Sequence, residues 1–434
     1  MSNKKNRILM LLENSFPRDP RVENEAYALR DRGFQVSIIA LTKRKEKKRE
    51  IVNGVTVYRL PFIKVFKGSL SEDAGMLARL IHSATSIIGY MVEYFYFTFG
   101  AFFVSLIVAF REGFDAIHAH NPPDTLFLVG LFYKMFGKKF VFDHHDVSPE
   151  LYASRFGRGN DLVQKFLFLI EKLCFWTANV VISTNQSYRS IAMERGGKKP
   201  EDVFVVRNGA NLERIYLVEP DPELKKMNKT ILGYLGALNP QDGVDYLLRS
   251  LHHLAYEINR KDFYCIIIGK GDALDDLRKL AVELDLQDYV RLTGYIPDQE
   301  MLKYLSTADI CVDPDPSSPL NDVSTWIKIM EYMALGKPIV TFDLKETHFS
   351  AQDAALYVPP NDEAAFAEAI VELMDNPRRR EEMGQFGQQR IADELAWHLQ
   401  IKYLYGAYDH LFGTEIQDFQ STASEQLGKY PNIS

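Results

Sequence analysis

The chain has 434 residues and a formal net charge of −7, and 46% of its residues are hydrophobic. This length predicts roughly two to three domains, with enough apolar side chains for full cores. Charged residues make up 25% of the sequence and acidic ones are in excess. The composition therefore argues against a general nucleic-acid-binding protein, and we expect no nucleic-acid partner.

The three cysteines lie far apart, within or beside apolar segments, at Cys174, Cys265 and Cys311. Their spacing matches neither a metal site nor a disulfide framework, which fits a reducing cytoplasm. The N-terminus starts with basic residues, but its apolar stretch is too short for a secretory signal. Residues 7–12 are better interpreted as a first buried strand. The sequence thus predicts a cytoplasmic protein.

Apolar strands alternate with helices through the first half of the chain. A strand over 8–12, a helix over about 22–32 and a strand over 35–41 form a βαβ unit. Further strands are predicted over 53–60, 114–120, 139–142, 178–183 and 203–206. This alternation is typical of a parallel sheet covered by helices.

Residues 87–110 form the most apolar stretch, and residues 94–110 pass without a charge. That length is at the short limit of a membrane-spanning helix. An ordinary buried strand follows at once, so a span would put the halves of one domain on opposite sides of a membrane, and we reject it. Two interpretations remain: a fully buried helix that covers the sheet, or a helix that lies in the membrane surface.

Two predicted strands end in polar clusters, HAHNPPD after 114–120 and DHHDVSPE after 139–142. In open parallel sheets, ligands bind beyond the carboxyl ends of the strands. A histidine in an apolar context is usually a satisfied core residue, but several together with carboxylates favour a site. The spacing requires no metal. The candidate residues are His120, Asp124, His145, Asp146 and Glu150.

The second half centres on residues 309–343, where a buried strand, a polar loop, a helix and a second buried strand follow one another. Ser324 or Thr325 is the expected N-cap of the helix. An open helix N-terminus behind a strand favours an anion, because free N–H groups and the helix dipole both attract negative charge.

Lys328 and Glu331 lie three residues apart on this helix and share a face. A cation and a carboxylate suit a ligand with both a phosphate and hydroxyls. The alternative is a surface ion pair of little energetic value.

The segment KIMEYMALGKPIV resembles the nucleotide-sugar motif of retaining glycosyltransferases of the GT-B fold, family 4, and further similarity extends over nearly the whole chain. The resemblance implies an α/β fold with two Rossmann-like, doubly wound domains that face each other across a cleft. It places an acceptor-side domain at 1–210, with 396–413 crossing back to it. The nucleotide-sugar-binding domain follows at 211–395, and a loose tail at 414–434.

Site roles follow from the same resemblance. The glutamate that matches Glu331 holds the ribose, while the loop and helix start, at Ser324 and Thr325, hold the diphosphate. His145 matches a histidine near the transferred sugar; with Asp146 and Lys328 it makes the expected catalytic set. Other expected donor-binding residues are Asn208, Gly236, Gly269, Gly271, Gly294 and Tyr295. The expected acceptor-side residues are His120, Asp124 and Glu150.

The chain departs from the family in the loop after Gly236, where an arginine and a lysine are replaced by Ala237 and Asp242. The first glutamate of the family's Glu-x7-Glu motif is Val323. Burying a diphosphate without compensation would cost several kcal/mol. We therefore expect Lys328 to contact the phosphates.

The resemblance implies transfer of a sugar from a nucleotide-diphosphate sugar to an acceptor hydroxyl with retention, without a cofactor or a metal. The expected partners are the nucleotide sugar and a sugar or lipid-linked acceptor. The apolar 87–110 stretch adds the inner-membrane surface as a candidate partner. It suggests a peripheral membrane protein in surface polysaccharide or glycolipid assembly. Two alternatives stay open: a sugar-nucleotide epimerase of the same fold, and a non-catalytic partner of another glycosyltransferase.

Overall fold

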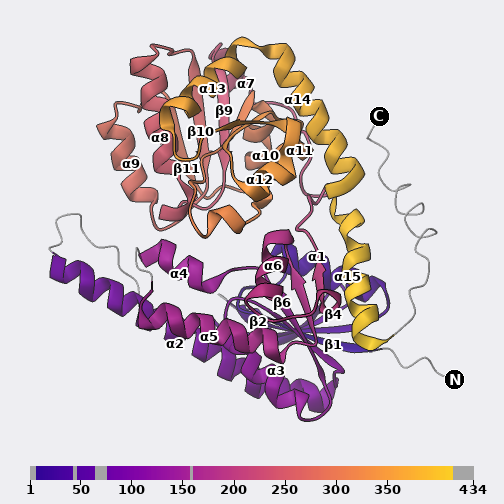
Figure 1. Cartoon of the computed structure of the whole chain (residues 1–434). Coiled ribbons are helices and arrows are strands. Elements are labelled where there is room, and N and C mark those ends of the chain that lie inside the picture. The colour runs from indigo at the N-terminus through magenta and orange to yellow at the C-terminus, as the bar shows by residue number, and fades with distance from the viewer. Residues whose placement is uncertain (1–5, 43–45, 64–75, 157–159, 414–434) are drawn as a thin grey trace. The chain divides into compact units, whose positions relative to one another are not determined.

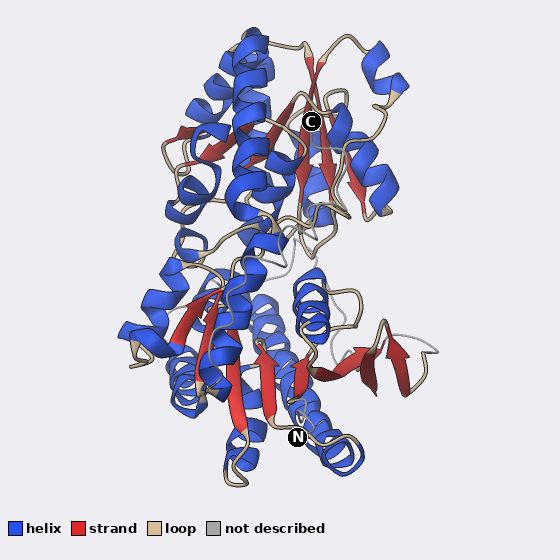
Figure 2. Ribbon diagram, turned by 90° about the vertical axis from the view of Figure 1, so that its right-hand side faces the viewer, coloured by secondary structure: helices blue, strands red, loops and turns tan. Residues whose placement is uncertain are grey.

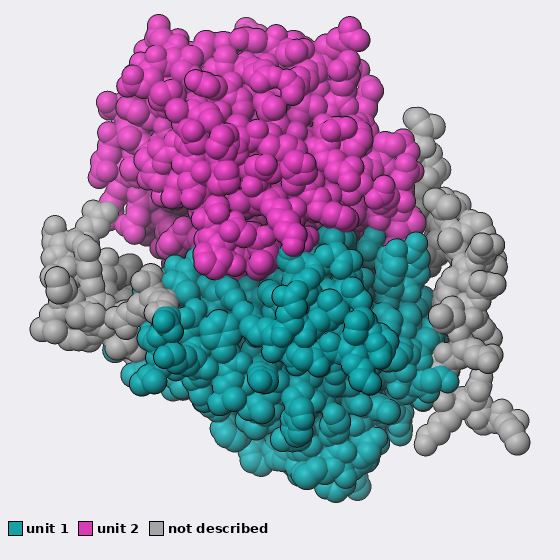
Figure 3. Space-filling view, in the orientation of Figure 1, with its two compact units in different colours: residues 1–207, 400–434 teal, residues 208–399 magenta. Residues whose placement is uncertain are grey.

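The computed structural model divides into two compact α/β units, which Figure 3 shows in different colours. Unit 1 contains residues 1–207 and 400–434, and unit 2 contains residues 208–399. The sequence predicts the division at 210/211 and 395/396. The tail that we predict to be loose, 414–434, lies outside the described residues. These are residues 6–42, 46–63, 76–156 and 160–413.

Unit 1 is built on an eight-stranded sheet with the order β3-β4-β2-β1-β5-β6-β7-β8. All neighbouring strands are parallel except β3, which pairs with β4 in the antiparallel sense (Figure 2). The sequence missed β3, a short edge strand without a buried residue. The strands are β1 (Arg7–Leu12), β2 (Gln35–Thr42), β3 (Arg49–Val52), β4 (Val55–Pro61), β5 (Ala116–His120), β6 (Lys139–His144), β7 (Val180–Ser183) and β8 (Val203–Val205).

The helices of unit 1 cover this sheet (Figure 1). The first begins where Asp19 caps it by accepting a hydrogen bond from the Arg21 backbone N–H, with Pro20 at its first position. The helices are α1 (Pro20–Asp31), α2 (Met76–Arg111), α3 (Phe127–Lys134), α4 (Ser148–Phe156), α5 (Leu162–Thr177), α6 (Gln186–Glu194) and α15 (Trp397–Phe412). From Gln400 on, α15 belongs to unit 1.

The apolar stretch of the sequence forms the second half of α2. One stripe of it, with Phe97, Ala101 and Val108, packs into the core. The opposite stripe is exposed, so the interpretation as a fully buried helix is wrong. By length and composition alone Ile87–Arg111 could cross a membrane, a weak criterion that the core helix of a soluble protein also meets. The exposed apolar side chains are Ile88, Met91, Val92, Phe99, Phe103, Leu106, Ile107 and Phe110.

Unit 2 is built on a six-stranded parallel sheet with the order β11-β10-β9-β12-β13-β14. The two buried strands predicted within residues 309–343 are confirmed as β12 and β13. The strands are β9 (Thr230–Leu235), β10 (Phe263–Ile268), β11 (Val290–Gly294), β12 (Ile310–Asp313), β13 (Ile339–Phe342) and β14 (Ala355–Val358). The helices are α7 (Pro222–Lys226), α8 (Val244–His252), α9 (Leu274–Glu283), α10 (Asp298–Thr307), α11 (Ile327–Ala334), α12 (Lys345–Ala351), α13 (Glu363–Asp375) and α14 (Pro377–Arg390).

Candidate active site

Three histidines of unit 1 converge on one buried carboxylate at the ends of β5 and β6. His120 Nδ1 and His145 Nε2 each lie 2.7 Å from Asp143 Oδ2, and His118 Nε2 lies 3.2 Å from it. His118 and His120 share a face of β5, since strand side chains alternate, and His120 pairs with Asp143 across the parallel strands. The strand register thus assembles the cluster.

The cluster combines ionised and neutral groups. Burial alone raises the pKa of Asp143, but His145 and the hydrogen bonds from the histidines outweigh it and hold this pKa well below its ordinary value. Burial and the nearby charge of Asp143 raise the pKa of Glu25 well above its ordinary value. Burial and the neighbouring His118 lower the pKa of His120 to about 3. At neutral pH, Asp143 is thus ionised, whereas His120 is neutral.

Asn121 ties the two predicted polar clusters together. Its Nδ2 donates to Asp124 Oδ1 (2.9 Å) and to the Asp146 carbonyl oxygen (2.6 Å). Its Oδ1 accepts from the backbone N–H groups of His145 (2.6 Å) and Asp146 (3.1 Å). One side chain thereby satisfies polar groups of both loops. The structure brings His120, Asp124, His145 and Asp146 together, and Asn121 is a residue that the sequence did not single out.

The first turn of α1 adds a cation to this cluster. Arg21 Nε lies 3.3 Å from Asp19 Oδ1. Burial by itself lowers the pKa of Arg21, but the charges of Asp19, Asp146 and Asp143 outweigh it and raise this pKa. Arg21 is a further residue that the sequence analysis did not single out.

Glu150 turns toward a different partner. Its carboxylate pairs with Arg195 (2.5 Å), which also lies 2.7 Å from Glu171 Oε1. Burial raises the pKa of Glu171 to about 8, although Arg195 opposes this shift. Glu150 is therefore part of an ion-pair network between α4, α5 and the end of α6, and its acceptor-side role remains a prediction.

A metal could be held in unit 1 by one ligand atom each from Glu25, His118, His120 and Asp143, all within 4.8 Å of one another. Histidine nitrogens and carboxylate oxygens suit a transition-metal ion. The same atoms also contact each other directly, as described above. The absence of a metal from the reaction therefore remains a prediction.

In unit 2, loops at the ends of three neighbouring strands meet backbone to backbone at glycines. A Cβ on Gly269, which has a φ of +153°, would overlap the carbonyl oxygen of Gly236, and one on Gly271 would overlap that of Leu238. The Gly269 N–H also donates to the Gly294 carbonyl oxygen at 3.2 Å. Because only glycine permits this approach, the predicted glycines form one continuous backbone surface at the ends of β9, β10 and β11.

Lys328 is buried between two carboxylates. Its Nζ lies 2.8 Å from Asp313 Oδ1 and 2.6 Å from Asp315 Oδ2, and 4.8 Å from the centre of the Tyr234 ring. Burial lowers the pKa of Lys328, but the two carboxylates outweigh it and raise this pKa well above its ordinary value. Asp242, which replaces the family's lysine, is also buried and caps Asn239 by accepting its N–H (2.9 Å).

The start of α11 differs from the prediction. Trp326, without a side-chain cap, precedes the first residue of the helix, so the assignment of Ser324 or Thr325 as N-cap is wrong. A 3₁₀ turn at Asn321–Val323 comes first, and Ser324 Oγ donates to the Leu320 carbonyl oxygen (2.7 Å). The hydroxyl is therefore used in the turn before the helix, and Lys328 lies within the first helical turn.

Glu331 has a partner that the sequence analysis missed. Its Oε1 accepts a hydrogen bond from Arg214 Nη1 (3.1 Å), and the same guanidinium pairs with Asp298 (2.9 Å). Burial raises the pKa of Glu331, and Arg214 opposes this shift. Of the other expected donor residues, Tyr295 is exposed, with Lys270 Nζ 4.9 Å from its ring centre. Asn208 lies at the first residue of unit 2.

Two family models match the chain. The model of Glycosyltransferase Family 4 matches residues 21–214, and the model of Glycosyl transferases group 1 matches residues 229–376. Together they cover most of the sequence. The fold and these matches define a protein with two parallel-sheet α/β domains of the GT-B class. The chain belongs to the glycosyltransferases of the family 4 type.

Relatives and solved structures agree with this assignment. An alpha-D-kanosaminyltransferase of Streptomyces kanamyceticus is 28% identical over 36% of this chain and 40% of its own length. A phosphatidyl-myo-inositol mannosyltransferase of Mycobacterium leprae is 28% identical over 42% of this chain and 46% of its own length. The match thus spans less than half of either relative.

Two solved structures share the fold at low sequence identity. Sucrose-phosphate synthase from Thermosynechococcus elongatus has a TM-score of 0.71 at 18% identity, over 95% of this chain and all of its own. HepE from Anabaena, in complex with UDP-glucose, has a TM-score of 0.65 at 16% identity, over 93% of this chain and all of its own. These likenesses show the fold alone.

Asp124 should make the stability of the protein depend on pH. Burial raises its pKa from 3.8 to about 6, against the hydrogen bonds from Ser148 and Asn121. The native state thus keeps this proton to higher pH than the unfolded chain, so the free energy of unfolding falls as the pH rises from about 4 to about 6. The side chain of the Asp124→Asn variant cannot ionise. Above pH 6 the free energy of unfolding of this variant should therefore exceed that of the wild type by about 2–3 kcal/mol.

Urea unfolding between pH 4 and pH 8 measures this difference. Asp31→Asn, the same change in an exposed ion pair on α1, serves as the control and should follow the wild-type profile. Parallel profiles for the wild type and Asp124→Asn would contradict the assignment.

Proposed function

We propose that the protein transfers a sugar from a nucleotide-diphosphate sugar to an acceptor hydroxyl with retention of the anomeric configuration. The observation that carries this proposal is the backbone surface of glycines at the strand ends of unit 2, with Glu331 on the neighbouring α11. Glycine loops let a backbone approach phosphates closely, and a carboxylate binds ribose hydroxyls. HepE, a structural neighbour at 16% identity, is a complex with UDP-glucose, which supports a nucleotide sugar as the donor.

Unit 1 supplies the groups that face the transferred sugar and the acceptor. His145 is fixed at the backbone by Asn121 and at Nε2 by Asp143. Among the described residues, none hydrogen-bonds to its buried Nδ1, which leaves this atom for a sugar hydroxyl. Arg21 stands beside the cluster as a cation. In an oxocarbenium-like transition state, negative charge grows on the leaving phosphate, so fixed dipoles and cations supply the main stabilisation.

The acceptor in this proposal is a lipid-linked sugar at the inner membrane surface. The exposed apolar stripe of α2 supports this. A helix that packs one face on the protein and exposes an apolar face can lie in the interface of a bilayer. One relative at 28% identity is a phosphatidyl-myo-inositol mannosyltransferase. The protein is then a cytoplasmic, peripheral membrane enzyme in polysaccharide or glycolipid assembly, which uses no cofactor and no metal.

Replacing His145 tests the catalytic assignment. His145→Ala should lower donor turnover about 10²-fold, the lower end of what a positioned side chain contributes, while donor affinity falls only several-fold, the effect of one lost hydrogen bond. His410→Ala, in a surface ion pair with Asp202, is the matched control and should keep full activity. The protein is dialysed against EDTA before the assay, and its metal content is measured. Activity that returns only when a metal ion is added back would overturn the proposal that the reaction needs no metal. Full turnover by His145→Ala would remove this residue from the mechanism.

The same assay separates the two alternatives. An epimerase converts or releases the donor without any acceptor. A transferase turns over the donor only when an extract that contains the acceptor is added. A non-catalytic partner binds the nucleotide sugar or its acceptor but turns over neither. The replacement of the family's basic pair by Ala237 and Asp242 makes this last comparison necessary.

Lys328 is tested in a background that keeps unit 2 folded. Lys328→Met alone leaves Asp313 and Asp315 buried without their cation and should lower the free energy of unfolding by about 3–5 kcal/mol. The double variant Lys328→Met/Asp313→Asn removes one charge of each sign and should recover most of this loss. If Lys328 contacts the donor phosphates, the double variant binds nucleoside diphosphates about 1.5–3 kcal/mol more weakly and nucleosides as before. Unchanged diphosphate binding, measured by calorimetry, assigns Lys328 to stability alone.

The membrane surface is tested by flotation with vesicles of anionic phospholipid. The variant Phe99→Ser/Phe103→Ser/Phe110→Ser changes three exposed side chains of α2. It should reduce the vesicle-bound fraction of the protein by about tenfold or more, because each phenyl ring that enters the bilayer buries a large apolar area there. Met227→Ser/Val282→Ser, at exposed positions of unit 2, is the control. Wild-type protein that does not float would reject the membrane role of α2. Phe102 is spared, because it packs against Phe132.

A further inference from the structure

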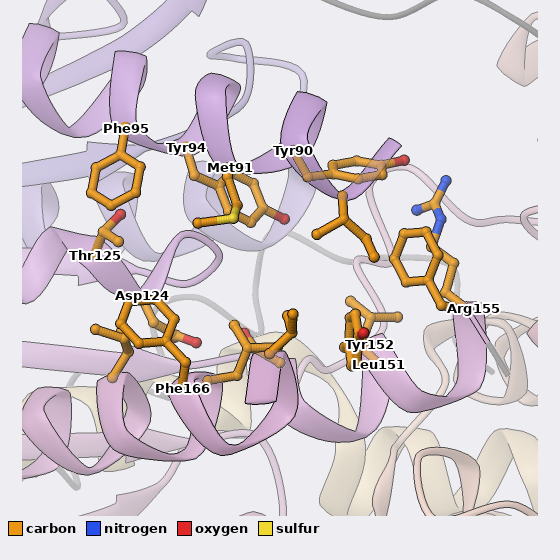
Figure 4. Close-up of a pocket in the computed structure, with 16 residues that line it drawn as sticks. Tyr90, Met91, Tyr94, Phe95, Asp124, Thr125, Leu151, Tyr152, Arg155 and Phe166 are labelled. Atoms are coloured by element: carbon orange, nitrogen blue, oxygen red, sulfur yellow. The ribbon is translucent and has the colours of Figure 1, made fainter. Parts of the chain in front are cut away.

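Unit 1 contains an apolar cavity of about 130 Å³ between α2, α4 and α5. Figure 4 shows Asp124 and Thr125 at one end of it and Arg155 at the other. An apolar cavity of similar size, about 150 Å³, binds a benzene molecule in another protein. The lining between the two ends consists mostly of rings and aliphatic chains, among them Tyr90, Met91, Tyr94, Leu151 and Leu167.

The cavity lies where the buried stripe of α2 continues beyond the sheet. In the second half of α2 this stripe packs into the core through Phe97 and Ala101. A hydrogen bond between Thr98 Oγ1 and Thr125 Oγ1 (2.7 Å) closes the inner end of the cavity. One turn earlier, at Tyr94, the same stripe faces the cavity instead of the sheet. The space that remains between this face and α4 and α5 has room for an apolar ligand.

The cavity is connected to both features that the proposed function uses. Met91 lines it and is also 41% exposed on the apolar side of α2. At its inner end, Asp124 accepts a hydrogen bond from Asn121, which also fixes the His145 loop. The wall formed by α4 begins at Ser148, three residues after His145. A ligand in the cavity thus lies between the membrane-facing stripe and the acceptor-side cluster.

A charge at the rim indicates what kind of ligand fits. The guanidinium carbon of Arg155 lies 4.8 Å from the centre of the Tyr90 ring, and both residues line the cavity. A cation on the rim of an apolar pocket suits an anionic group attached to a hydrocarbon chain, since guanidinium binds phosphate through paired hydrogen bonds.

We propose that this cavity binds the segment of hydrocarbon chain next to the phosphate of the lipid-linked acceptor, since its volume suits a group about the size of benzene. The phosphate of that lipid lies at Arg155, and its sugar is directed along α4 toward His145. This inference rests on the proposed function, because the ligand is the acceptor of that reaction. It assigns the cavity to the substrate and the exposed stripe of α2 to the bilayer. The acceptor is thus recognised by its chain and its phosphate as well as by its sugar.

The test uses the full-length protein and farnesyl phosphate, a soluble isoprenoid chain with one phosphate, in calorimetric titrations. Leu167→Trp fills the cavity from α5 and should weaken binding by about tenfold or more, which corresponds to about 1.4 kcal/mol. Leu169→Trp on the same helix is 52% exposed and does not line the cavity, so its affinity should stay within about twofold of the wild type. Arg155→Met should weaken binding of farnesyl phosphate but not of farnesol.

Each outcome decides for or against the cavity. Leu151→Trp fills it from α4 and replaces Leu167→Trp if that variant does not fold. Equal affinity in wild type and in the folded filling variant would overturn the proposal, as would equal binding of inorganic phosphate and farnesyl phosphate. Protein that binds phospholipid vesicles but no farnesyl phosphate would also overturn it and assign the region to bulk lipid. Binding needs no turnover, so a failed chain site and a failed transferase activity are distinguished.

Discussion

The arrangement of unit 1 depends on one carboxylate, Asp143, which three histidines approach within hydrogen-bond distance. A buried charge is tolerated only when its environment compensates it, and here the compensation comes from the adjacent strand β5 and from the loop after β6. The same requirement aligns the ends of β5 and β6, because any shift in their register would move His120 away from Asp143. The cluster that is proposed to bind the sugar is therefore also a condition for the correct pairing of the strands.

Unit 2 buries a cation where unit 1 buries an anion, and its charge is also compensated by neighbouring side chains. Lys328 is a buried cation held by Asp313 and Asp315, and Asp242 adds a third buried acidic group nearby. A cation whose charge is already neutralised attracts a phosphate less than a free one. The arginine and the lysine that the family has in the loop after Gly236 are absent here. Backbone N–H groups at the glycine loops therefore carry a larger share of any diphosphate binding. Arg214 adds a cation beside Glu331.

The sequence predicted the elements that rest on local patterns and missed those that depend on distant partners. The parallel strands follow from short apolar runs between turn residues, and the strand-end position of His120 and His145 predicted their proximity. The pairing of Glu150 with Arg195 joins residues far apart in the chain, and no local pattern encodes it. The helix start at α11 failed for another reason, because a 3₁₀ turn competes for the same hydroxyl. The face that α2 exposes is as apolar as its buried face, so hydrophobicity alone does not distinguish them and only the structure does.

Unit 1 is discontinuous, and this has a consequence for how the chain folds. The segment of α15 from Gln400 belongs to it, and supplies Tyr408 to the Nδ1 of His118 (2.9 Å) and Asp409 to Arg32 (2.5 Å). During synthesis, residues 1–207 emerge first, but His118 and Arg32 find these partners only after all of unit 2 has been made. Domains generally fold as units from the N-terminus during synthesis. Here the unit that begins first is completed last, so a ribosome-bound chain passes through a stage in which unit 2 is whole and the histidine cluster lacks its outer support.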